Sequence, residues 1–129
     1  MISIICLIFA SIFKALIDVL NSRFNVSVFN KIKNEKLRNW FNPTISWKNK
    51  YKDGDSTKGP KFFLSTTVFV MFTDGWHLFN SGMILSFILA LTLNVYYVPF
   101  FSIIIDTILY HILYGIVFEP FYSKFLIKK

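Results

Sequence analysis

The sequence predicts an all-α fold: a small polytopic helical membrane protein with three transmembrane helices, or four short ones, and a basic amphipathic segment between the first and second. The chain of 129 residues is 54% hydrophobic and only 16% charged, whereas a soluble domain carries roughly a quarter charged residues. Residues 62–120 contain no Lys or Arg, although the segment before them is rich in both. A long apolar tract between basic segments is typical of a region that spans a bilayer.

At this length we expect a single membrane domain, residues 1–129. Residues 1–20 are apolar, and a helix of about 20 residues spans the roughly 30 Å core of a bilayer. Lys14 and Asp18 are spaced to pair on one face near the end of this helix. A cleaved signal peptide is the rival interpretation, but a basic start and a clear cleavage site are both missing.

Residues 21–61 form a basic segment with ten basic and three acidic side chains. Asn21–Asn39 predicts an amphipathic helix that lies on an anionic membrane surface. The rest mixes aromatic residues with lysines, which is typical of the headgroup layer. The expected interfacial residues are Trp40, Trp47, Tyr51, Lys48, Lys50 and Lys52. Because the cations flank apolar segments, we expect anionic lipids as partners and no nucleic acid.

The apolar pattern of residues 63–93 predicts the second span, and Ser65 is the expected capping residue at its start. The 29 residues from Ser65 to Leu93 would make roughly 43 Å of helix, longer than a bilayer core, so we expect a tilt, a start in the interface, or a break near Gly75 or Ser81-Gly82. Residues 97–118 predict the third span, and residues 119–129 form a basic tail. Both basic regions then lie on the cytoplasmic side of an inner-type membrane, with the N-terminus outside.

Ionisable side chains inside the later spans are expensive in lipid and therefore indicate a buried polar network. Its expected members are Asp74, His77, Ser81, Asp106, Tyr110 and His111. The first three share one helix face, and the last three lie on one arc of the third span. Helix rise per residue predicts that Asp74 and Asp106 meet near mid-membrane. The opposite face, which includes Ile105 and Leu109, is expected to face lipid.

Small residues form a strip beside the polar face of the second span, at Gly75, Gly82 and Ser86. Such strips allow two membrane helices to approach closely. The sequence therefore predicts that another helix packs against this strip.

Three functions fit the polar network. We favour a helix-packing or partner-binding membrane subunit, in which the network forms hydrogen bonds between helices. An alternative is a divalent metal site formed by Asp74, His77, Asp106 and His111, although Asp106 and His111 lie about 140° apart on their helix. A further alternative is proton or ion movement along these groups, which would need an oligomer because three spans are few. The cofactor is therefore none, or a divalent metal ion.

An enzyme is poorly supported, because the sequence contains no G-x-S-x-G motif and its serines lack motif context. In size and architecture alone the chain resembles holins, which are short, helical, oligomeric pore formers with a basic end. A pore of that kind would not require the Asp74, His77, Asp106 and His111 groups. The expected protein partner is a second copy of the chain or another membrane protein.

Overall fold

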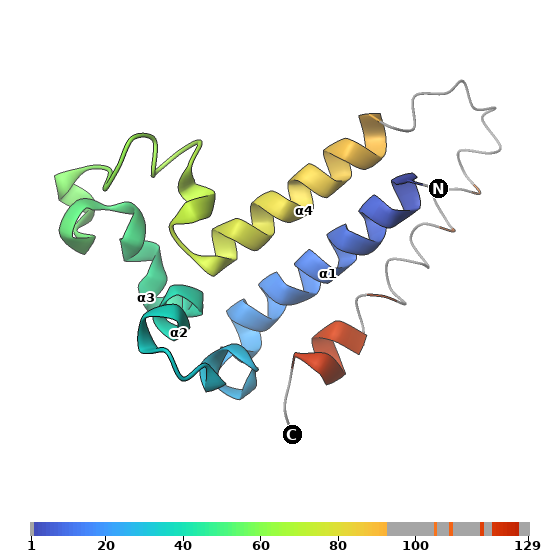
Figure 1. The fold of residues 1–129 in the computed structure, drawn as a ribbon, viewed down its shortest axis with the longest axis horizontal. Helices are drawn as coiled ribbons and strands as arrows, with labels where there is room; N and C mark the ends of the chain where they lie inside the picture. The colour runs from blue at the N-terminus through green and yellow to red at the C-terminus, as the bar shows by residue number, and fades with distance from the viewer. Residues whose placement is uncertain (1, 93–104, 106–108, 110–116, 118–119, 127–129) are drawn as a thin grey trace.

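The computed structural model describes residues 2–92, Ile105, Leu109, Val117 and residues 120–126. These residues are all-α, as the sequence predicts (Figure 1). The α-helices within them are α1 (Ile2–Arg23), α2 (Glu35–Phe41), α3 (Pro43–Ser46) and α4 (Gly75–Thr92). Short 3-10 turns lie at Phe24–Val26, Phe29–Lys31, Trp47–Lys50, Lys52–Gly54, Ser56–Lys58 and Val70–Phe72, and a π-helical turn lies at Phe121–Phe125.

The two long helices, α1 and α4, pack side by side and run in opposite directions (Figure 1). Gly82 makes this close approach possible, since a Cβ atom there would lie 2.8 Å from Cζ of Phe13 on α1. The predicted small-residue contact is thus confirmed at Gly82. Gly75 faces a different neighbour, because its Cβ would lie 2.3 Å from Cδ1 of Phe41 on α2.

The first helix agrees well with its prediction from hydropathy. Lys14 donates to both carboxylate oxygens of Asp18, as the spacing predicts. Among the described residues, one helix is long and apolar enough to cross a membrane: it covers Ser3–Val26, with a mean hydropathy of 2.3 over 18 residues. A signal sequence near the N-terminus would meet the same criterion.

The amphipathic helix predicted for Asn21–Asn39 does not form as one piece, and that prediction was wrong. α1 ends at Arg23, and two 3-10 turns follow. Short polar side chains bind the local backbone there, as when Ser27 Oγ donates to the Phe24 carbonyl at 2.7 Å. Asn34 then begins a new helix, α2, by accepting a hydrogen bond from a backbone N–H of that helix at 3.1 Å. Such local bonds compete with a continuous helix.

The second predicted span also begins later than expected. Ser65 does not cap a helix: its buried Oγ donates to the Lys50 carbonyl at 2.7 Å. Leu64 has a φ of 55°, which a helix does not accommodate. The chain therefore turns repeatedly up to Thr73, and the apolar helix is limited to α4. The third predicted span, residues 97–118, lies outside the described residues except at three positions.

The buried core lies at the end of the helix pair that adjoins the basic segment. Its members are Ala15, Val19, Leu20, Phe29 and Leu126. The Val28 N–H donates to the Leu126 carbonyl at 3.0 Å. The start of the basic segment and the C-terminal turn therefore lie at the same end of the molecule (Figure 1).

Candidate functional site at the start of α4

Asp74 is the N-cap of α4. Its carbonyl accepts from the Leu78 N–H at 3.1 Å, and its Oδ1 accepts from the His77 N–H at 2.8 Å. The other carboxylate oxygen lies 2.7 Å from Nδ1 of His77 and 3.2 Å from Thr73 Oγ1, whose single proton is shared with the Val70 carbonyl at 2.7 Å. Asp74 is only 1% exposed, so the helix start is anchored by a buried carboxylate with both oxygens bonded.

The pKa of the Asp74 carboxyl lies below its ordinary value. Burial by itself raises this pKa, because it disfavours the charged form. The hydrogen bonds and charge of His77, together with the Thr73 hydroxyl, outweigh burial and lower the pKa. Asp74 is therefore a carboxylate at neutral pH, and a negative charge at the N-terminus of a helix also interacts favourably with the helix dipole.

His77 is oriented by this carboxylate. Because a carboxylate can only accept, Nδ1 of His77 is the donor to Asp74. The ring stands edge-on to Trp76, with 5.0 Å between centroids. Both residues line a small hollow of about 180 Å³. The other residues that line it are Asn21, Pro43, Ser46, Trp47 and Asp74.

A hydrogen bond between residues far apart in sequence also holds the start of α4. Asn49 Nδ2 donates to the Thr73 carbonyl at 3.1 Å, which fixes the residue before the cap to the basic segment. No local sequence pattern identifies Asn49, because the residue that it binds follows it by 24 positions. Asp74 itself carried a usable signal, since an aspartate just before an apolar run is a typical helix start.

The position predicted for Asp74 along its helix needs correction. The sequence places it partway along a helix and near mid-membrane. In the structure it precedes the first residue of α4, and its neighbour Thr73 is bonded to Asn49 of the basic segment, so it lies at one end of the helix pair. Ser81 is half-buried, one turn beyond His77 in α4. Asp106, Tyr110 and His111 lie outside the described residues, and their predicted approach to Asp74 stays a prediction.

The predicted interfacial residues form small aromatic and cationic groups. Trp47 stands edge-on to Tyr51, with ring centroids 6.2 Å apart. The Lys48 ammonium lies 5.8 Å from the Trp47 ring, and the Lys50 ammonium lies 5.5 Å from the Tyr51 ring. These distances are within the range of cation–π attraction. Trp40 packs separately against Phe41, and Lys52 is exposed.

Metal chemistry needs more ligands than the described part of the site supplies. Within residues 2–92 and the few described positions after them, no three His, Cys, Asp or Glu side chains gather around one point. Asp74 and His77 provide at most two adjoining ligands there.

No protein-family model, no curated protein and no solved structure matches the chain.

Proposed function

We propose that the chain is a small integral membrane protein that acts as a helix-packing or partner-binding subunit. In this proposal α1 and α4 lie in the bilayer, and residues 24–74 lie on the cytoplasmic membrane surface. The observation that carries the proposal is the amount of apolar side-chain surface that the helix pair exposes.

The outward faces of both helices consist of large apolar side chains. The exposed ones are Ile4, Ile5 and Phe9 on α1, and Ile84, Leu85, Phe87, Ile88, Leu89 and Leu91 on α4. A helix that is apolar on nearly all sides belongs in a core or in a membrane, and a patch of this extent is rare on a soluble monomer. The apolar part of α4, Gly75–Leu91, is shorter than a full span, and the 18 residues of the helix give roughly 27 Å, which is the thickness of the thinner bilayers.

The charge distribution supports the orientation. The hydrogen bond between Val28 and Leu126 joins the basic segment to the C-terminal turn, where Lys124 is exposed. Cations next to membrane spans are retained on the cytoplasmic side. Both basic regions meet this rule if their shared end of the molecule faces the cytoplasm.

Topology reporters test this arrangement. Fusions at Asn34 and at the C-terminus should report the cytoplasm, and a fusion after Val95 should report the opposite side. The protein should stay in the membrane pellet after alkaline carbonate extraction, and its intact mass should include α1. A C-terminal fusion that reports the outside would contradict the three-span arrangement, and loss of α1 from the mature mass would identify a signal peptide instead.

The packing role is supported by how the Asp74 carboxylate is used. Both of its oxygens bind donors from Thr73 and His77, within one turn of the helix. A group used in this way stabilises the start of α4 and needs no ion. The metal and proton alternatives, through Asp74, His77, Asp106 and His111, are supported by one feature: a carboxylate that orients a histidine is common beside metal sites.

Metal analysis separates these functions. We expect detergent-purified protein to contain far less than one equivalent of zinc or iron, because the Asp74 carboxylate is already occupied by hydrogen bonds. Protein purified after growth with added zinc should give the same result, and Asp74→Asn should not change it. Stoichiometric metal that disappears in the Asp74→Asn variant would overturn the packing proposal in favour of a metal site.

A further inference from the structure

A pocket of about 630 Å³ on the basic segment carries three lysines and no carboxylate. We call it the basic pocket. Its lining consists of Lys36, Asn39, Trp40, Ile45, Ser46, Lys48, Asn49, Lys61, Phe62, Phe72 and Thr73. The volume falls within the range of sites that bind small ligands. Lys36, Lys48 and Lys61 reach it from three separate parts of the chain, so the fold, and not local sequence, brings these charges together.

Hydrogen bonds between distant residues hold the walls of the basic pocket. The Lys61 N–H donates to the Lys50 carbonyl at 2.9 Å, and Ser65 Oγ donates to the same carbonyl at 2.7 Å. Asn49, a lining residue, donates to the carbonyl of Thr73, another lining residue, at 3.1 Å. The pocket therefore has a framework that does not depend on its lysine side chains.

The three ammonium groups have no carboxylate partner in the part of the chain that the structure describes. The ion pairs found there are Lys14–Asp18, Lys58–Asp53 and His77–Asp74. Three lysines and no carboxylate in its lining make the pocket positively charged, and a positively charged pocket attracts an anion. Asn39 in the lining adds a neutral amide that can donate to the anion.

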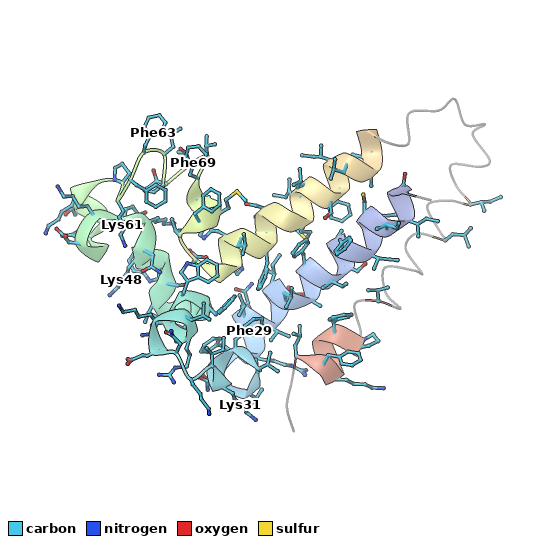
Figure 2. All side chains as sticks on the ribbon, in the orientation of Figure 1. Phe29, Lys31, Lys48, Lys61, Phe63 and Phe69 are labelled. Atoms are coloured by element: carbon cyan, nitrogen blue, oxygen red, sulfur yellow. The ribbon has the colours of Figure 1, made fainter. Side chains whose placement is uncertain are left out.

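Exposed aromatic side chains adjoin these cations. Phe62 and Phe72 line the pocket and are 41% and 60% exposed. Phe63, in the same turn region, is 77% exposed. Figure 2 shows Phe63 and Phe69 on the same side of the molecule as Lys61 and Lys48, while Lys31 lies away from them. A free ion would gain nothing from these rings, whereas a lipid would contact them with its acyl chains.

We propose that the basic pocket binds the phosphate headgroup of an anionic phospholipid, with the lysines on the phosphate and the neighbouring phenylalanines among the acyl chains. This inference rests on the proposed function, because it requires the segment to lie on a membrane. The proposal is that a single lipid occupies a defined site. It therefore differs from the general attraction of a basic surface to an anionic bilayer, which involves no defined site.

The test compares two triple variants of the full-length protein in neutral detergent. One variant carries Lys36→Gln, Lys48→Gln and Lys61→Gln. The matched control, Lys31→Gln, Lys33→Gln and Lys124→Gln, removes the same charge from exposed lysines that do not line the pocket. Phosphatidylglycerol is titrated into each protein, and the bound lipid is counted by native mass spectrometry. Circular dichroism checks that both variants keep their helix content.

We expect one phosphatidylglycerol to bind the unmodified protein and the control with similar affinity. The pocket variant should bind it roughly 100-fold more weakly, because each of the three lysines contributes about 1 kcal/mol to binding. Equal loss in both variants would overturn the defined site but leave the membrane-surface proposal intact. Displacement of the lipid by an equal concentration of glycerol phosphate would overturn the lipid assignment in favour of a free phosphate. Failure of the protein to remain in carbonate-washed membranes would contradict the proposed function itself.

Discussion

Replacing Asp74 with alanine should lower the free energy of unfolding by about 3 kcal/mol. The substitution removes an N-cap, which is worth about 1 kcal/mol, and also charge-assisted hydrogen bonds to His77 and Thr73, worth about 2 kcal/mol more. The site is buried, so water replaces these bonds poorly. Unfolding of the purified protein in mixed micelles, followed by circular dichroism, measures the change.

Asp55 provides a matched control for this effect. It also caps a turn, where its carboxylate accepts from the Thr57 N–H at 2.9 Å and the Thr57 hydroxyl at 2.8 Å, but it is exposed. Asp55→Ala should therefore cost well under 1 kcal/mol. Asp74→Asn, which keeps a capping oxygen and loses the charge, should fall between the two alanine variants. If Asp74→Ala were no more damaging than Asp55→Ala, the buried cap would not stabilise the fold as argued.

The same carboxylate predicts a dependence on pH. Because folding lowers the pKa of Asp74, its stabilising contribution is complete above the ordinary carboxyl pKa of about 3.9 and is lost as the pH falls through the lower, folded value. The unmodified protein should thus lose more stability than Asp74→Asn when the pH is taken below about 4. Equal losses in the two proteins would show that other carboxyl groups account for the acid sensitivity.

Gly82→Val should lower the free energy of unfolding by about 2 kcal/mol, because it adds bulk where α1 and α4 touch. Even the first added carbon would lie 2.8 Å from Cζ and 2.9 Å from Cε2 of Phe13. That ring packs against Phe79, with centroids 6.2 Å apart, so it has a neighbour that restricts its movement. The same unfolding experiment measures the loss.

A double-mutant cycle shows whether the clash with Phe13 is the cause. In a Phe13→Leu background the six-membered ring is gone, and Gly82→Val should cost at least 1 kcal/mol less than in the unmodified protein. Leu91→Val places the same β-branched residue at a position of α4 that is 73% exposed, and it should change stability by less than about 0.5 kcal/mol. Additive effects of the Phe13 and Gly82 substitutions would argue against direct contact.

The sequence predicted the parts of the fold that depend on local chemistry. Hydropathy located α1, and the spacing of Lys14 and Asp18 predicted their ion pair, because both properties lie within one helix. Asp53 and Gly54 are residue types that favour turns, and both have positive φ values in the structure. The small side chain at Gly82 indicated that a helix could pack closely there, and the structure identifies Phe13 as the residue that does so.

The remaining parts depend on contacts between residues far apart in sequence. An apolar run suggested a helix from Ser65, but the bond from Ser65 to the Lys50 carbonyl holds that region in turns. The basic pocket was not predicted, since its lysines were interpreted as a diffuse interfacial charge. The shared site between Asp74 and the third span was predicted from helix rise alone, and that estimate assumed a helix start that the structure moves to Gly75.

The cap at the start of α4 also has a consequence for how the sequence can change over evolutionary time. A residue that caps a helix through a short side chain can be replaced by Asn, Ser or Thr, which reach the same backbone N–H, and less readily by Glu, whose extra methylene moves the carboxylate away. A metal ligand would instead be exchanged for Glu, His or Cys. Diverged versions of this protein should accordingly keep a short polar side chain at position 74 and never carry proline at position 77, because that residue supplies the N–H that Asp74 binds; replacing the imidazole there gives up only the second bond to the carboxylate.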